Sequence, residues 1–129
     1  MKLKYFSFMF LVFAGFGCHG HDDGNNAIQI DILRPGEGEV IVNPSKTDLW
    51  VNFNATGELH EIEIELYQKD ERDEKIFYFE KHVHEKTFEF RESIDLSSFP
   101  KGTSFDLEIK ACLDEKCTTF IEEEITFSI

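Results

Sequence analysis

Apolar and polar residues alternate with a period of two through most of the chain, and this pattern restricts the fold more than any other feature. The segment 28–32 reads Ile-Gln-Ile-Asp-Ile, and the same spacing recurs at 49–55, 60–68 and 105–111. Successive side chains of a β-strand point to opposite faces, whereas a helix would require a period of about 3.6 residues. The alternation therefore predicts strands that each bury one face.

Shorter apolar stretches add further candidate strands. They lie at 40–42, 76–79, 82–84, 88–96 and 118–129. The segment 69–75 is so rich in charge that we predict a loop there. About seven short strands without a convincing helix indicate an all-β, antiparallel two-sheet sandwich, and a small closed barrel is the alternative.

Residues 1–17 have the layout of a bacterial export signal. A basic start at Met1–Lys4 precedes an apolar run that ends in small residues, Gly15 and Gly17. The run is shorter than the roughly 20 apolar residues that cross a bilayer, and polar residues follow it at once. We therefore predict a signal peptide and not a membrane-spanning segment.

The signal ends in Gly17-Cys18, which resembles the lipobox of bacterial lipoproteins in the relaxed form found in Bacteroidota. The resemblance implies that the Cys18 sulfur receives a diacylglyceryl group and that Cys18 becomes the first residue of the mature chain. Each buried methylene contributes about 0.8 kcal/mol, so two or three acyl chains would anchor the protein stably. Ordinary signal cleavage is the alternative, because Gly15-x-Gly17 also has a small-x-small spacing.

The segment 18–26 is polar and lacks apolar periodicity, so we predict a flexible tether there and a single domain over 27–129. Its Asp22-Asp23 pair resembles the acidic export tag of Bacteroidota lipoproteins that reach the outer face of the outer membrane. A solvated linker is the alternative. The expected location is the outer membrane, on its periplasmic or its cell-surface side.

The charge of the chain restricts its partners. Cleavage after Gly17 would remove two lysines and no acidic residue, which changes the formal charge from −13 to −15. Such a charge repels nucleic acid and anionic lipid headgroups, so the lipid anchor is the only expected membrane contact. The chain also lacks a Gly-x-Ser-x-Gly elbow, a phosphate-binding glycine loop and a His-Glu-x-x-His motif, so we do not expect an enzyme.

Two cysteines remain when Cys18 is assigned to lipid. In an exported chain, Cys112 and Cys117 are expected to form a disulfide across the mouth of the last hairpin. The bond would close a very small loop, for which chain entropy predicts about 2 kcal/mol of stabilisation. A zinc site on Cys-x4-Cys is the alternative, but it would need two further ligands.

Three motifs span nearly the whole predicted domain. They read Ile30-x-Ile32-x-x-Pro35-x-x-Gly38, Val51-x-Phe53-x-Ala55 and Gly102-x-x-Phe105-x-Leu107-x-Ile109-x-Ala111. Together they resemble the single Ig-like domains of Bacteroidota lipoproteins. The resemblance implies an Ig-like β-sandwich that serves the cell envelope as a non-catalytic binding or structural module for a protein or a glycan.

Trp50 is the only tryptophan of the chain, and it alternates with the apolar set of its own strand. It is therefore predicted to lie on the outer face of a sheet. An aromatic ring in that position can stack on a sugar or anchor a protein partner. The alternative is that a loop covers this face.

Two histidine clusters are candidate metal ligands. His82-x-His84 would place both imidazoles on one side of a strand, and His19-x-His21-Asp22 forms a second cluster in the tether. Imidazole suits copper and zinc, so a metal-handling lipoprotein that binds copper, zinc or calcium is the alternative function. Two solvated histidines are the other interpretation, because no third ligand stands near His82 in the sequence, and no other cofactor is expected.

Two runs of glutamate are predicted to form an acidic face. They are Glu61, Glu63 and Glu65 on one strand and Glu122, Glu123 and Glu124 on the last strand. One interpretation is that the face is hydrated and prevents edge-to-edge association of strands. The other is that it binds a cationic partner or divalent ions.

Overall fold

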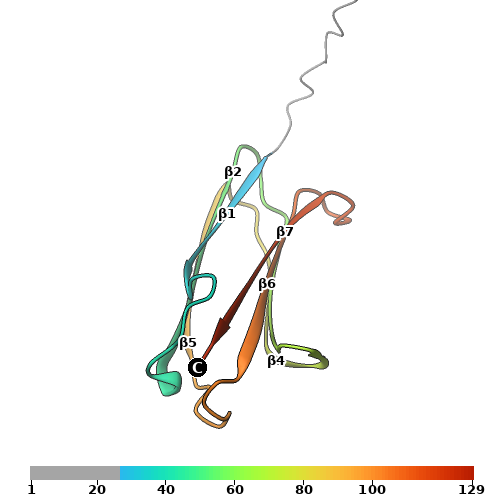
Figure 1. Ribbon diagram of the computed structural model, residues 1–129. Coiled ribbons are helices and arrows are strands. Elements are labelled where there is room, and N and C mark those ends of the chain that lie inside the picture. The colour runs from blue at the N-terminus through green and yellow to red at the C-terminus, as the bar shows by residue number, and fades with distance from the viewer. Residues whose placement is uncertain (1–26) are drawn as a thin grey trace, which may run out of the picture.

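The computed structural model describes residues 27–129, which form two antiparallel sheets packed face to face (Figure 1). The first sheet has the order β1-β2-β5, with β1 at Ile28–Arg34, β2 at Thr47–Ala55 and β5 at Thr87–Ile94. The second has the order β4-β3-β6-β7, with β3 at Glu61–Gln68, β4 at Glu71–His82, β6 at Ser104–Cys112 and β7 at Phe120–Ser128. The predicted all-β, Ig-like sandwich is confirmed.

The predictions for the amino-terminal segment lie outside the described residues. They concern the signal peptide at 1–17, the lipidation of Cys18, and the tether with His19, His21 and Asp22.

The core consists of the apolar residues that the two-residue period assigned to the inner faces. The fully buried members of the three longest alternating segments are Leu49, Val51 and Phe53 in β2, Ile62, Ile64 and Leu66 in β3, and Phe105, Leu107, Ile109 and Ala111 in β6. The strand register places these residues side by side across the sheet. For example, Ile64 pairs with both Ile109 of β6 and Phe79 of β4. The two sheets therefore bury one face each, as the alternation predicts.

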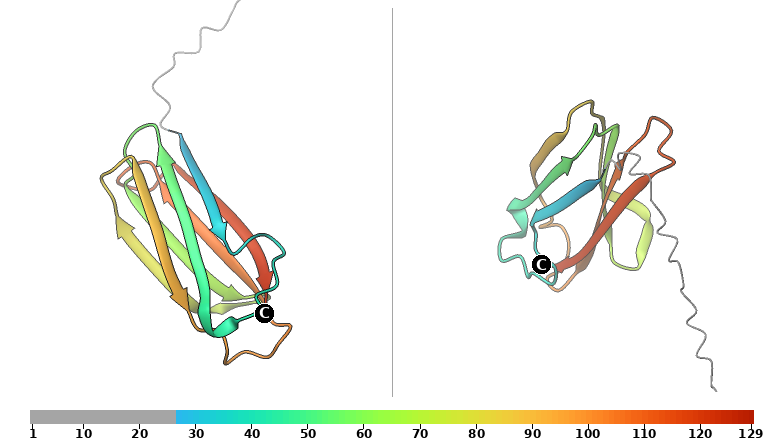
Figure 2. Two further views of the ribbon diagram at one scale, coloured as in Figure 1. Left: turned by 90° about the vertical axis from the view of Figure 1, so that its left-hand side faces the viewer. Right: turned by 90° about the horizontal axis from the view of Figure 1, so that it is seen from above.

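The strands run between two ends of the sandwich (Figures 1 and 2). β1 begins at the end that carries the β6–β7 loop with Cys117, which we call the disulfide end. The β2–β3 and β4–β5 connections lie at the same end, because the strands alternate in direction. In the usual constant-type Ig arrangement the fourth strand joins the sheet of the first two, whereas here β4 pairs with β3.

The segment between β1 and β2 crosses from one sheet to the other. After the bulge near Arg34 the chain runs parallel to β7, with a bridge between Val40 and Ser128. The amide of Ile41 donates to the Ser128 carbonyl at 2.8 Å, and the Ser128 amide donates to Glu39 at 3.0 Å. The predicted edge piece at 40–42 is thus a single bridge that covers the last part of β7. A 3₁₀ turn at Pro44–Lys46 follows.

The predicted charged loop at 69–75 is wrong. Only Lys69 and Asp70 form a turn, and residues 71–75 belong to β4, which continues to His82. Because β4 is an edge strand and residues 71–75 are exposed, charges on both of its faces stay hydrated and do not prevent pairing. The predicted strand at 82–84 therefore exists only as the end of β4.

No helix among residues 27–129 is long and apolar enough to cross a membrane.

Candidate functional site

The disulfide between Cys112 and Cys117 is present, with 4.9 Å between the two Cα atoms. It does not span the hairpin mouth as predicted, because the ladder partner of Cys112 is Phe120 and Cys117 lies within the loop at a φ of 51°. β7 accordingly begins at Phe120 instead of the predicted Thr118. The disulfide closes the loop at the end of β6 and leaves both strands intact.

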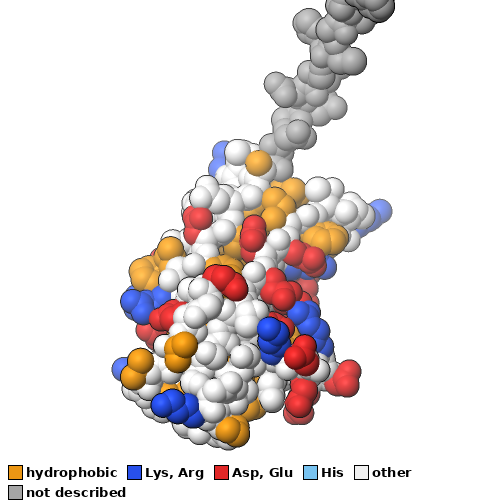
Figure 3. Space-filling view, in the orientation of Figure 1, with side chains coloured by type: hydrophobic (Ala, Val, Ile, Leu, Met, Phe, Trp, Pro, Cys, Tyr) orange, Lys and Arg blue, Asp and Glu red, His pale blue; other side chains and the backbone are white. Residues whose placement is uncertain are grey.

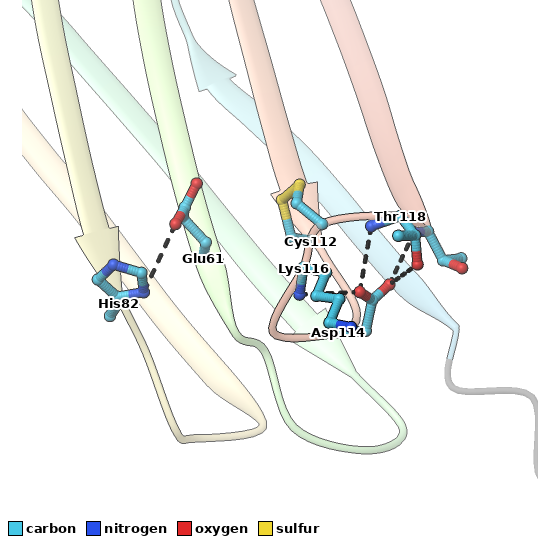
Figure 4. Close-up of a disulfide and its surroundings, with 8 residues drawn as sticks. Glu61, His82, Cys112, Asp114, Lys116 and Thr118 are labelled. Atoms are coloured by element: carbon cyan, nitrogen blue, oxygen red, sulfur yellow. Dashed lines mark hydrogen bonds and ion pairs between the residues drawn. A yellow bond between two sulfur atoms is a disulfide. The ribbon is translucent and has the colours of Figure 1, made fainter.

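The Asp114 carboxylate organises this loop (Figure 4). It accepts hydrogen bonds from the amides of Lys116 at 3.0 Å, Thr118 at 3.1 Å and Thr119 at 2.7 Å, and from the Thr118 hydroxyl at 2.9 Å. The backbone bonds from Thr118 and Thr119 lower the pKa of Asp114 to about 2. Because these donors already satisfy its oxygens, Asp114 is a structural group and not a ligand for a cation.

Replacing Asp114 with alanine should change how stability depends on pH. Because the folded-state pKa lies below the ordinary value of 3.8, the carboxylate stabilises the fold above about pH 4, and this contribution is lost as the pH falls towards 2. Asp114→Ala is therefore expected to lower the urea midpoint at pH 7, by an amount that shrinks between pH 4 and pH 2. A midpoint difference that is the same at pH 7 and pH 3 would contradict this role.

Trp50 lies on the outer face of the three-stranded sheet, as predicted. It pairs with Arg34 of β1 and Arg91 of β5, and the Arg91 guanidinium carbon lies 4.6 Å from the centre of its ring. Figure 2 shows this sheet facing the viewer in its left panel, with no other described segment across it. Among residues 27–129 no loop covers this face, unlike in the predicted alternative, and the Arg91 side chain lies over part of the ring.

Two polar atoms on this face are buried and lack a hydrogen-bond partner among the described residues. They are the indole N–H of Trp50 and the side-chain oxygen of Asn52, which lies two residues further along the same face of β2. A buried donor or acceptor without a partner costs about 1–3 kcal/mol. One donor and one acceptor on this face are thus unsatisfied, which is the combination that a hydroxyl group can complement.

The histidines of the described residues gather at the disulfide end, but His82 and His84 do not form one ligand set. The ring of His84 packs edge-on against that of His60, with 6.0 Å between centroids. His82 instead lies with Glu61 and Glu80, and one ligand atom from each lies within 4.8 Å of the others. The predicted pair is replaced by a cluster of one imidazole and two carboxylates.

The predicted acidic face lies on the outer side of the four-stranded sheet, where acidic side chains gather with a few cations among them (Figure 3). A groove of about 320 Å³ runs along it, and its lining residues are Glu63, Glu65, Glu108, Ile109, Lys110, Glu122, Glu123 and Glu124. Glu123 differs from its neighbours because it pairs with the core residue Ile109 and so belongs to the inner side of β7. A charge in that position discourages pairing with another strand.

Arg72 of β4 neutralises the part of this face farthest from the disulfide end. Its guanidinium forms ion pairs with Glu108, with Glu124 at 3.1 Å and with Asp106 at 3.5 Å, and lies 5.7 Å from the centre of the Tyr67 ring. One side chain therefore connects β4 with β6 and β7 across the width of the sheet. Since Arg72 is 47% exposed, these pairs contribute modestly to stability.

The neighbouring carboxyl groups of the face differ in pKa. Burial raises the pKa of Glu63, and the adjacent Glu65 raises it further. Burial also opposes the charge of Glu65, but hydrogen bonds, chiefly from Lys75, outweigh burial and lower its pKa. The pKa of Glu65 therefore lies below that of Glu63, and Lys75 is the main cause.

A more apolar hollow lies at the end opposite the disulfide loop. It has a volume of about 360 Å³ and is lined by Val40, Ile41, Val42, Pro44, Phe99, Lys101 and Ile129. Of these lining residues, Val42 is 95% exposed, and Lys101 is the only one with a charged side chain. The hollow offers apolar contact but no group for chemistry.

Sequence reasoning missed Asn52 and Arg91 around Trp50, and Glu80 beside His82. Asn52 shares the parity of Trp50, so the two-residue period could have included it. Glu80-x-His82 has the same spacing as His82-x-His84, so Glu80 could have been found by the same rule. Arg91 comes from another strand, and only the register of β2 with β5 reveals it.

A scan of protein-family models, a search of curated proteins and a search of solved structures each found no match to this chain.

Proposed function

We propose that the chain is a membrane-anchored envelope lipoprotein whose Ig-like sandwich is a non-catalytic module that binds a glycan or a protein. The signal-like segment at 1–17 and the lipobox-like Cys18 support the anchor, and the polar segment 18–26 supports a tether. The outer membrane, on its periplasmic or cell-surface side, is the proposed location. The face around Trp50 is the proposed contact surface.

The unpartnered indole N–H of Trp50 beside the unpartnered oxygen of Asn52 carries this proposal. A sugar hydroxyl both donates and accepts, so it can satisfy these two atoms while the pyranose ring stacks on the indole. The cross-strand neighbours of Asn52 are Asp31 and Glu89, which can accept further hydroxyl hydrogen bonds. Of the two partner classes, a glycan therefore fits the chemistry of the face better.

Arg91 must move aside for such contact, and the cost is small. An exposed cation–π contact contributes about 0.5–1 kcal/mol. Hydrogen bonds to two buried, unsatisfied polar atoms can contribute more than that. Arg91 is exposed, its guanidinium lies over the Trp50 ring, and it forms no ion pair within residues 27–129. It therefore acts as a removable cover.

Trp50→Ala is expected to weaken binding about 30-fold, because an aromatic residue at the centre of an interface contributes about 2 kcal/mol. The purified protein is tested first on a glycan array and in a pull-down of envelope proteins. The affinity for the identified partner is then measured for the wild type and the variant by titration calorimetry.

Tyr78→Ala is the matched control, because Tyr78 is an aromatic residue that is 45% exposed but belongs to the four-stranded sheet. It should leave the affinity unchanged, and Arg91→Ala should leave it unchanged or increase it. Absence of any glycan or protein partner, or an equal loss with Tyr78→Ala, would refute the Trp50 face as the binding surface.

A further inference from the structure

The strongest cluster of metal-ligating side chains lies where β3 begins and β4 ends. Glu61 and His82 are cross-strand partners, and Glu80 stands two residues before His82 on the same face. The imidazole Nδ1 of His82 lies 3.5 Å from the Glu61 carboxylate (Figure 4). Strand periodicity therefore places Glu80 beside His82, and the antiparallel register of β3 with β4 adds Glu61.

This end of the acidic face lacks the cations that neutralise the rest. Lys75 contacts Glu65, and Arg72 contacts Glu108. Within residues 27–129, no lysine or arginine forms an ion pair with Glu61 or Glu80. The Tyr78 hydroxyl donates a hydrogen bond to Glu80. The two carboxylates and the imidazole thus lie close together without an ion pair to a lysine or arginine.

The distance between the His82 and Glu61 ligand atoms suits a transition-metal ion. Two ligands bound to zinc at about 2.0–2.1 Å in tetrahedral geometry are separated by about 3.4 Å. The observed 3.5 Å between His82 and Glu61 is close to that value, but it is long for a hydrogen bond. We propose that Glu61, Glu80 and His82 bind one divalent transition-metal ion, with water completing its coordination.

The donor set selects the class of ion. Imidazole with carboxylate suits zinc and copper, whereas calcium requires six to eight oxygen ligands, and two glutamates supply at most four. The site lies on the four-stranded sheet, and Trp50 lies on the outer face of the other sheet. Metal binding and partner binding are therefore independent, and either can fail without the other.

Titration calorimetry of the purified protein with Zn²⁺ tests the site. His82→Ala is expected to weaken Zn²⁺ binding by at least about tenfold, since even changes around metal ligands cost 10- to 100-fold in affinity. Glu61→Gln and Glu80→Gln should each weaken it as well. A second readout is the melting temperature, which Zn²⁺ should raise in the wild type and not in His82→Ala. His82 is 71% exposed, so its replacement should leave the fold intact.

His84→Ala is the matched control, because it removes a histidine two positions away that packs on His60 instead. It should leave Zn²⁺ affinity unchanged. The disulfide must be intact during the titration, because reduced thiols would add metal ligands. Glu61, Cys112 and Cys117 each have one ligand atom within 4.8 Å of the other two. A non-reducing thiol assay verifies that the disulfide is intact.

Three results would overturn the proposal. The first is wild-type Zn²⁺ binding no tighter than millimolar, and the second is unchanged Zn²⁺ affinity in His82→Ala. The third is an equal loss of affinity in His84→Ala, which would mean that His82 and His84 bind the ion together. Partner binding by the wild type is measured in the same preparation without metal. If the partner does not bind under these conditions, the result counts against the Trp50 face and not against the metal site.

Discussion

Phe105→Ala is expected to lower the free energy of unfolding by about 3–5 kcal/mol. Phe105 is fully buried in β6, and its ring packs against Phe127 at 5.4 Å and edge-on against Phe99 at 5.2 Å between centroids. Truncation removes both ring contacts and leaves a cavity. Since domains of this size have about 5–15 kcal/mol in total, the variant should be close to unfolding at 37 °C. Urea denaturation followed by circular dichroism measures the change.

Phe120→Ala is the control for this prediction. Phe120 is 45% exposed at the start of β7 and contacts Lys110 through its ring face, with 4.6 Å between the Lys110 nitrogen and the ring centre. Its truncation should cost about 1 kcal/mol or less, because exposed cation–π contacts are weak and no cavity forms. Similar losses for the two variants would mean that Phe105 does not occupy the centre of the core.

The fold was largely predictable because apolar and polar residues alternate with a period of two in the central strands. In β2, β3 and β6 one face is buried by the opposite sheet, so each second residue must be apolar, and the sequence records that requirement directly. The edge strand β4 has no such requirement over residues 71–75, where every residue is exposed. The sequence there carries charge on both faces, and local pattern alone cannot separate such a strand from a loop.

The Trp50 face was predictable in part. Parity along β2 places Trp50 on the outer face, and this requires no knowledge of other strands. The Arg91 cover depends on the register between β2 and β5, whose paired residues Asn54 and Thr87 are 33 positions apart in sequence. Register across so long a separation comes from the packing of both sheets, and no short motif encodes it.

The same reason explains the histidine cluster. The sequence places His82 and His84 at chelating spacing, but this spacing holds only while the strand continues, and β4 ends at His82. Beyond that point the chain turns, and His84 packs against His60. Glu61 becomes a neighbour of His82 through the β3–β4 ladder, across the long hairpin that sequence analysis had divided with a loop.

Cys18→Ser is expected to abolish fatty-acid incorporation into the chain, because the serine oxygen cannot replace the thiol that receives the diacylglyceryl group in lipoproteins. The proposed anchor rests on this one sulfur. Cells fed an alkyne-labelled fatty acid should label the wild type and not the variant. Mass spectrometry of the wild type purified from membranes should show an acylated cysteine at the amino end.

Cys117→Ser is the matched control, since it removes a sulfur of the Cys112–Cys117 disulfide and should leave labelling unchanged. Two results would contradict the anchor: labelling that persists in Cys18→Ser, and an unmodified amino end at or after Cys18 in the wild type. The second would favour ordinary cleavage after Gly15-x-Gly17. Since binding at the Trp50 face needs no anchor, the sandwich could still bind its partner, but as a released protein.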